Sequence, residues 1–177
     1  VHQNEPATIY RTFDLGAQAI TVPHINTKEE ALSVVDSGKF APIGNRGSFT
    51  SRQGIGVDDY FSQANDQTML IILIEDIIAV NNLDEILEVE NIDVFFVAPG
   101  DLAQTMGYPG GAGRREVKEV VEGAIKKISS SGRTAGTLAG TDAVGRYIDF
   151  GARFFSFSYL PWLAEGAEKF HETVTKA

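Results

Sequence analysis

Two acidic residues, Glu75 and Asp101, each follow an apolar run and could together hold a metal ion. Glu75 comes directly after the run 69–74, and three residues separate Asp101 from the run 94–97. Carboxylate oxygens, completed by water and substrate, are the ligands that Mg²⁺ and similar hard cations prefer. The spacing gives equal weight to an alternative, in which both acids only begin helices. We interpret the neighbouring Asp76 as a helix-start acid rather than a ligand.

The apolar runs around these acids show little of the alternation that marks a sheet with one solvated face, so we interpret them as strands buried on both faces. The predicted strands are 19–22, 69–74, 94–97, 134–138 and 154–159. Apolar residues at three- and four-residue spacing predict helices between them. The predicted helices are 6–15, 27–37, 81–87, 116–130, 142–150 and 161–175.

Strands that alternate with helices in this way pair in parallel through right-handed crossovers, so the fold class is α/β. Ligands of parallel sheets and barrels lie beyond the carboxyl ends of the strands. Because the strands that precede Glu75 and Asp101 are consecutive, and parallel neighbours lie about 4.8 Å apart, the two carboxylates can converge on one ion. Residues 1–3 are the only stretch left to supply a strand before the first helix, and residues 40–57 are expected to form a surface loop.

Composition excludes several classes of function. Fifteen Lys and Arg against twenty-four Asp and Glu give a formal charge of −9, which repels nucleic acid and anionic membranes. The chain has no cysteine, so disulfides and thiolate chemistry are excluded and a cytoplasmic protein is expected. No apolar run has the roughly 18 residues of a membrane helix. We expect neither a nucleic-acid partner nor a membrane partner.

Motifs along nearly the whole chain resemble the HpcH/HpaI family of metal-dependent class II aldolases, which act on 2-keto-3-deoxy and 4-hydroxy-2-oxo acids. The motifs are DLGAQAITVPHINTKEEA at 14–31, PIGNRG at 42–47, ANDQ at 64–67, the segment 74–110 that includes VFFVAPGDL, and GRYIDFGARFFSF at 145–157. The resemblance implies a TIM (β/α)8-type barrel. Such barrels have about 250 residues, so residues 1–177 are expected to form one partial barrel domain, truncated at its N-terminus, with about strands 3 or 4 to 8.

The same resemblance assigns roles at the carboxyl edge of the sheet. It implies that Glu75 and Asp101 hold a divalent metal (Mg²⁺, Mn²⁺ or Co²⁺), and that pyruvate is the donor substrate with an aldehyde as its partner. The turn that contains Pro99 and Gly100 would aim backbone amides at the carboxylate of pyruvate. Leu138 matches a position that borders the aldehyde pocket, although it is at least as consistent with a plain core residue.

Two departures from the family pattern concern catalysis. The His–Asp base of the family and the arginine that binds the carboxylate of pyruvate would precede Val1, so no catalytic residue is assigned. His24, at the end of the first predicted strand, is a candidate base, and a solvated loop histidine is the alternative. Leu73 stands where the family places a glutamine, and leucine cannot donate a hydrogen bond to a keto acid. Arg46 of the GNRG motif is interpreted as a residue that orders its loop.

Three functions remain. The first is an aldehyde-lyase that reversibly cleaves the keto acid to pyruvate and an aldehyde, which the intact metal pair favours. The second is a non-catalytic protein that binds metal and keto acid or serves in assembly, which Leu73 and the unassigned base favour. The third is a relative of the citryl-ester lyases. An open sheet needs its edges covered, so a homo-oligomer, a trimer or hexamer, is expected, with Trp162 in the last helix as an apolar anchor or, alternatively, packed on its own barrel.

Overall fold

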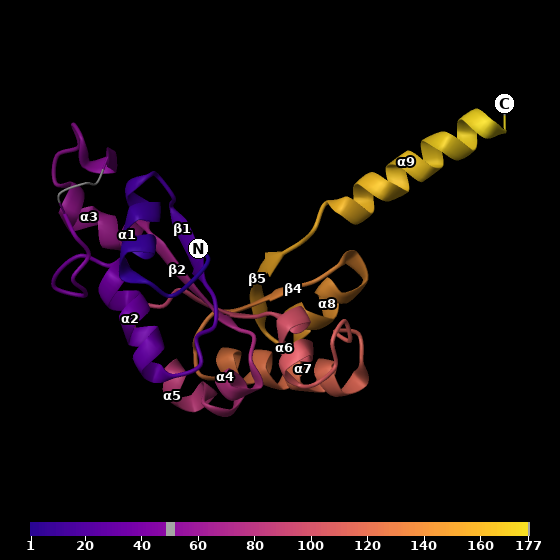
Figure 1. The fold of residues 1–177 in the computed structure, drawn as a ribbon, viewed down its shortest axis with the longest axis horizontal. Coiled ribbons are helices and arrows are strands. Elements are labelled where there is room, and N and C mark those ends of the chain that lie inside the picture. Colours follow the sequence, from indigo (N-terminus) through magenta and orange to yellow (C-terminus); the bar gives the residue numbers. More distant parts are fainter. Residues whose placement is uncertain (49–51, 177) are drawn as a thin grey trace.

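A computed structural model describes residues 1–48 and 52–176 and contains one sheet of five parallel strands. The strands are β1 (Ala19–Val22), β2 (Met69–Ile74), β3 (Val94–Val97), β4 (Ala135–Leu138) and β5 (Ala152–Ser156). They are hydrogen-bonded to one another in chain order, from β1 to β5. The predicted α/β class with a parallel sheet is therefore confirmed (Figure 1).

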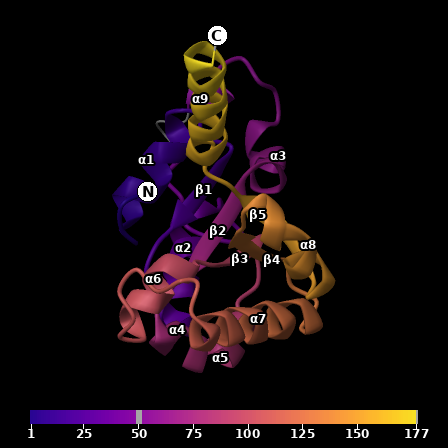
Figure 2. The same cartoon turned by 90° about the vertical axis from the view of Figure 1, so that its right-hand side faces the viewer.

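Helices connect the strands and cover one face of the sheet, apart from α9, which follows the last strand. They are α1 (Pro6–Asp14), α2 (Lys28–Gly38), α3 (Tyr60–Gln67), α4 (Ile77–Asn81), α5 (Leu83–Leu87), α6 (Pro99–Thr105), α7 (Arg115–Ser130), α8 (Thr141–Asp149) and α9 (Leu160–Thr175), with a 3-10 turn, η1 (Arg52–Gly54). Figure 2 shows α5 and α7 together on one side of the strands. The main core lies between these helices and the strand residues that face them, such as Leu70, Ile72 and Phe95.

The opposite face of the sheet has a small core of its own. Ile71, Val94 and Phe96 form it, with Leu73 and Phe154 packed against them, and no helix residue belongs to this cluster. Alternation along β2 places Leu70, Ile72 and Ile74 on the helical side and residues 69, 71 and 73 on the other. We call this second side the inner face of the sheet.

Local sequence signals explain where several helices begin. The Thr27 side chain accepts from the amide of Glu30, and the Glu30 carboxylate accepts from the amide of Thr27, which forms a complete capping box at the start of α2. Asp76 accepts from the amide of Ile78 at 2.8 Å and is the N-cap of α4. The interpretation of Asp76 as a helix-start acid is therefore confirmed.

Three sequence predictions about elements were wrong. Residues 1–3 form no strand, although the amino group of Val1 donates to the carbonyl of Thr21 at 2.9 Å beside β1. Helices α3, α4 and α6 were missed; α3 begins after a left-handed Asp59 without a side-chain cap and buries only Ala64, so its apolar pattern is weak. The last strand ends at Ser156 rather than 159, because the chain leaves the sheet before α9.

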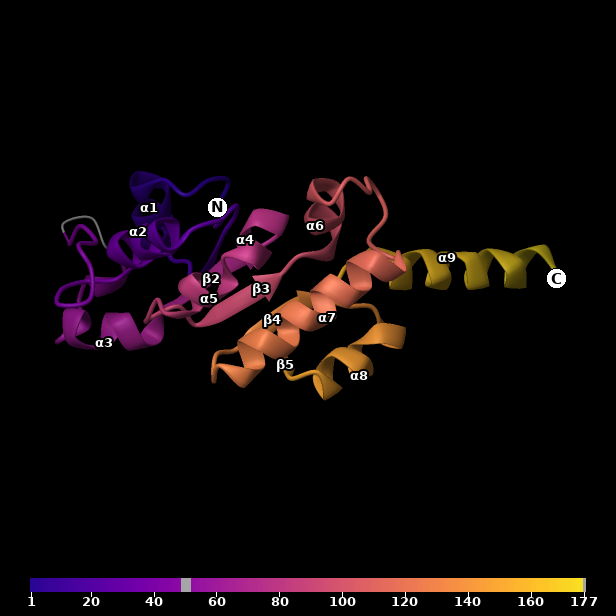
Figure 3. The same ribbon diagram turned by 90° about the horizontal axis from the view of Figure 1, so that it is seen from below.

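Helix α9 projects from the rest of the chain and has no buried residue (Figure 3). Leu163, Phe170 and Val174 are exposed by 65%, 73% and 59%, and their spacing places them along one stripe of the helix. At its base, the ring of Trp162 lies 4.1 Å from that of Phe157. Over the described ranges, no helix is both long and apolar enough to cross a membrane.

Candidate active site

Glu75 is a buried carboxylate at the carboxyl end of β2. Two residues after Leu73, it follows the alternation of the inner face, and its exposed fraction is 3%. Its Oε1 accepts a hydrogen bond of 2.9 Å from the backbone amide of His24, which stands just beyond the end of β1. Strand β2 pairs with both β1 and β3. Three neighbouring strands therefore deliver their carboxyl ends to the surroundings of Glu75.

Asp101 lies close enough to Glu75 to change its ionisation. Burial raises the pKa of Glu75 above the usual glutamate range, and the nearby carboxyl group of Asp101 raises it further. The amide and the imidazole of His24 act in the opposite direction. That the side chains at 75 and 101 converge on one ion stays a prediction, which the influence of Asp101 on the pKa of Glu75 supports.

The chemistry of this pair fits a divalent cation. A buried carboxylate beside a second acid is short of positive charge, and the ring of His24, which contacts Glu75, is 71% exposed. A hard cation would favour both ionised carboxylates and match their oxygen donors. In the ranges 1–48 and 52–176, no group of three or more His, Cys, Asp or Glu residues could hold a metal. The protein would thus supply Glu75 and Asp101, and other oxygen donors would complete the shell.

His24 contacts Glu75 through both its backbone and its ring. The ring Nδ1 lies 3.2 Å from Oε1 of Glu75, and the residue has a left-handed φ of 56°. That conformation is uncommon outside glycine and turns the amide toward the acid. The exposed ring and its contact with Glu75 are consistent with the alternative of a satisfied or solvated loop histidine, so His24 as a base stays a prediction. The backbone contact was not visible in the sequence, since any residue type carries an amide.

Pro99, Gly100 and Asp101 form the first turn of α6 rather than a separate turn. The N-cap is Ala98, which has no side chain that could cap the helix, and Asp101 lies in the first turn, as the alternative of a helix-start acid expects. The amides of Gly100 and Asp101 donate to no acceptor in the part of the chain that the structure describes. A Cβ at Gly100 would meet nothing within 4 Å. The start of α6 is therefore open to a bound group.

Leu138 and Leu73 border the inner face near this edge. Leu138 ends β4 and is 51% exposed, so the interpretation of Leu138 as plain core was wrong. Leu73 lines a cavity of 300 Å³ together with Phe96 and Phe154. The cavity walls also include Phe155, Thr21 and Ser156. No pattern in the sequence indicated that β1 and β5 would line one apolar cavity with Leu73, because this depends on how the whole sheet curves.

Comparisons with known proteins agree on one family. Residues 1–159 match the HpcH/HpaI aldolase/citrate lyase family. The 2-keto-3-deoxy-L-rhamnonate aldolase of Salmonella paratyphi B is 38% identical over 158 residues, which cover 86% of this chain and 59% of that relative. The chain thus spans less than two thirds of the length of the curated relative that it matches.

Solved structures match the whole arrangement of strands and helices. An HpcH/HpaI aldolase/citrate lyase family protein from Burkholderia cenocepacia J2315 superposes with a TM-score of 0.87 at 25% identity, over 98% of this chain and 71% of that chain. The HpcH/HpaI aldolase from Desulfitobacterium hafniense DCB-2 gives a TM-score of 0.85 at 24% identity, over 99% of this chain and 70% of that chain. The fold expected from the sequence, a sheet of the TIM-barrel type, is therefore confirmed.

Proposed function

This chain belongs to the HpcH/HpaI aldolase/citrate lyase family, and from that premise we propose that it contributes to an aldolase reaction. The reaction would reversibly cleave a 2-keto-3-deoxy or 4-hydroxy-2-oxo acid to pyruvate and an aldehyde. The observation that carries this proposal is the proximity of two acids, Glu75 and Asp101, at the carboxyl edge of the sheet, where Asp101 raises the pKa of buried Glu75. The name of the Salmonella relative, an aldolase of a 2-keto-3-deoxy sugar acid, supports a substrate of the same class.

The cofactor we propose is Mg²⁺, Mn²⁺ or Co²⁺, held by Glu75 and Asp101. A divalent cation, when bound, supplies Lewis-acid chemistry that stabilises negative charge developing on a keto oxygen. His24 would orient the acid through its amide, which holds Oε1 of Glu75 at 2.9 Å. This is the role that outer-shell hydrogen bonds play at metal sites.

The start of α6 would bind the carboxylate of pyruvate. The free amides of Gly100 and Asp101 point out of the first helical turn, where they carry partial positive charge. Buried Pro99 fixes the backbone at this turn, and the open space at Gly100 leaves room for the substrate. The apolar cavity beside Leu73 would exclude water from the reacting carbon. Leu138, exposed at the same edge, would border the aldehyde.

A protein that binds a keto acid without turnover is the second candidate. Leu73 favours the binding protein, because its apolar side chain on the inner face cannot donate a hydrogen bond to a bound keto acid. No catalytic base is assigned in this chain. Among the described residues, His24 is the one histidine that contacts the candidate site, and its ring is exposed. The intact pair of acids favours the enzyme.

Turnover and binding can be separated in one set of measurements. The chain is incubated with pyruvate, Mn²⁺ and either glycolaldehyde or succinic semialdehyde, and the aldol product is followed by chromatography. Product that a chelator abolishes supports the aldolase, whereas calorimetric binding of pyruvate without product supports the binding protein. Asp76→Asn is the matched control, because asparagine also caps α4 and should leave both signals intact. Mn²⁺-independent product would contradict the proposal.

We also propose that the protein is a homo-oligomer in which α9 packs on a second copy. The stripe of Leu163, Phe170 and Val174 is exposed, and such a stripe is typical of a helix that packs on another surface. Leu163→Asp should lower the sedimentation coefficient, whereas Glu168→Gln on the same helix should not. A wild-type protein that sediments as a monomer at micromolar concentration would contradict this proposal.

A further inference from the structure

Arg46 is a buried cation whose bonding is incomplete. Its side chain is 1% exposed, and its Nη2 donates to Oδ1 of Asp14 at 3.0 Å. The guanidinium carbon lies 4.9 Å from the ring centroid of Phe13 and 4.4 Å from that of Phe40. Its Nε and Nη1 have no acceptor in residues 1–48 and 52–176. A buried charged donor without an acceptor costs roughly 1–3 kcal/mol or more, so this environment favours an acceptor from outside the protein.

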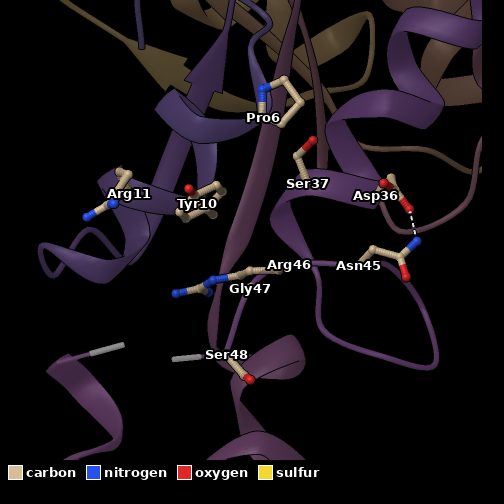
Figure 4. A pocket seen from close by; sticks show the side chains of 9 residues that line it. All are labelled: Pro6, Tyr10, Arg11, Asp36, Ser37, Asn45, Arg46, Gly47 and Ser48. Carbon is tan, nitrogen blue, oxygen red and sulfur yellow. Dashed lines mark hydrogen bonds between the residues drawn. The ribbon is translucent and has the colours of Figure 1, made fainter. Parts of the chain in front are cut away.

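A pocket of 440 Å³ adjoins this arginine (Figure 4). Its walls are one side of α1, the end of α2, and the loop from Asn45 to Ser48. In Figure 4 the side chain of Arg46 extends from that loop toward the side formed by Tyr10 and Arg11. The end of α2 points to the amino edge of the sheet, so the pocket lies away from Glu75. The volume is sufficient for a small organic acid.

Further donors with no partner border the same pocket. The hydroxyl of Ser37 belongs to a residue that is 5% exposed. Neither that hydroxyl nor the hydroxyl of Tyr10 has a hydrogen-bond partner within the described ranges, and the guanidinium of Arg11 has no carboxylate there. Arg46, Ser37, Tyr10 and Arg11 thus all line this pocket and can all donate, which favours a ligand rich in acceptors. Arg46 would contribute its positive charge from the wall.

The pocket also contains acceptors that restrict the charge of such a ligand. The carboxylate of Asp36 accepts from Nδ2 of Asn45 at 2.5 Å, which leaves its second oxygen and the Asn45 carbonyl oxygen free to accept. A dianion would be repelled by Asp36, whereas a hydroxyl group would donate to it. The wall thus combines donors for one carboxylate with acceptors for hydroxyl groups.

We propose that this pocket binds a small hydroxylated carboxylate, with its carboxylate toward Arg11, Tyr10 and Ser37 and its hydroxyls toward Asp36 and Asn45. The site is separate from the acids at the carboxyl edge. It does not depend on the proposed aldolase chemistry, since binding requires neither metal nor turnover.

Titration calorimetry with D-gluconate as the probe tests the site. Wild-type protein and Glu75→Ala should bind gluconate equally. Arg11→Gln should weaken binding about 10- to 100-fold, as expected when a charged hydrogen bond of about 1.5–3 kcal/mol is lost. Ser37→Ala should weaken it several-fold. Arg115→Gln, an exposed arginine on α7, is the matched control and should bind as the wild type does.

Three outcomes would overturn the proposal. The first is no heat with gluconate at millimolar concentration in a folded wild-type protein. The second is binding that survives both Arg11→Gln and Ser37→Ala unchanged. The third is inorganic phosphate or propionate binding as tightly as gluconate, because the first carries more charge and the second has no hydroxyl. These exposed or small substitutions are chosen over Arg46→Gln, which could unfold the loop that Arg46 orders.

Discussion

Both edges of the sheet hold a buried charge, but only the amino edge surrounds it with complementary partners. Lys39, 4% exposed, donates to the carbonyls of Asn65 and Thr68 at 2.6 Å each and lies 3.9 Å from Asp93. Glu75 at the carboxyl edge has one backbone amide, an exposed imidazole, and a second acid beside it. At the amino edge the buried charge has its hydrogen-bond partners, which is typical of a residue that stabilises the fold. At the carboxyl edge negative charge is in excess, which is typical of a binding site.

Removing an acid at the carboxyl edge should have the largest effect. Glu75→Ala or Asp101→Ala should abolish the rise in Tm that Mn²⁺ causes, together with any aldol product, because each takes away one of two protein ligands. Differential scanning fluorimetry with and without Mn²⁺ measures the first effect. A variant that keeps the full Mn²⁺ response would remove that acid from the proposed ligand pair, while Asp76→Asn should respond as the wild type does.

Removing the cation at the amino edge should cost stability rather than function. Lys39→Met leaves the carbonyls of Asn65 and Thr68 without their buried donor, which we expect to lower the free energy of unfolding by about 3–5 kcal/mol. Urea unfolding followed by circular dichroism measures this. Lys118→Met, at an exposed position of α7, should change it by less than about 0.5 kcal/mol. Equal effects of the two substitutions would contradict the difference between the edges.

The excess negative charge should also have a smaller effect, on how the free energy of unfolding of the metal-free protein depends on pH. Burial, helped by Asp101, raises the pKa of Glu75 in the folded state. Its contribution to stability is therefore fully present below the pKa of an unfolded glutamate and is lost as the pH rises through the folded value. Glu75→Gln should flatten this loss and be more stable than the wild type at neutral pH. Denaturant midpoints from pH 4 to pH 8 measure it.

A matched substitution sharpens that test. Glu119→Gln removes an acid on the exposed side of α7 and should leave the slope as in the wild type. A wild-type slope that Glu75→Gln leaves unchanged would show that Glu75 is not the group responsible.

The smallest effect is expected at Leu138. Because the side chain is 51% exposed, Leu138→Ala should change the free energy of unfolding by less than about 0.5 kcal/mol. Its expected consequence is confined to the KM for the aldehyde, measured at saturating pyruvate. A decrease in the free energy of unfolding of about 2 kcal/mol or more, as for a buried leucine, would instead show that Leu138 is a core residue.

The strands were predictable from sequence because burial on both faces leaves long apolar runs. The bounds of β1, β2 and β3 agree with the runs 19–22, 69–74 and 94–97. The expectation that Glu75 and Asp101 lie near each other followed from the same logic, since they follow consecutive parallel strands. Helix α3 could not be predicted, because only Ala64 is buried and no side chain caps its start.

The rest of the site depends on contacts that no local pattern encodes. The bond from the amide of His24 to Glu75 joins residues 51 positions apart and requires a left-handed backbone that histidine adopts only occasionally. The unfinished bonding of Arg46 was likewise invisible. Its interpretation as a loop-ordering residue agrees with the ion pair to Asp14, but two unpaired nitrogens can be counted only in three dimensions.

The chain carries a built-in optical reporter. Its single tryptophan, Trp162, lies at the base of α9 and stacks on Phe157. An isolated helix of this length is marginal in water, so the order of α9 depends on what it packs against. The fluorescence of Trp162 should therefore change when α9 leaves the surface that it packs on, for example on dilution. It should not change when the distant β1–α2 region unfolds. Spectroscopic melting curves of this protein should be checked against a second probe before they are interpreted as the stability of the sheet.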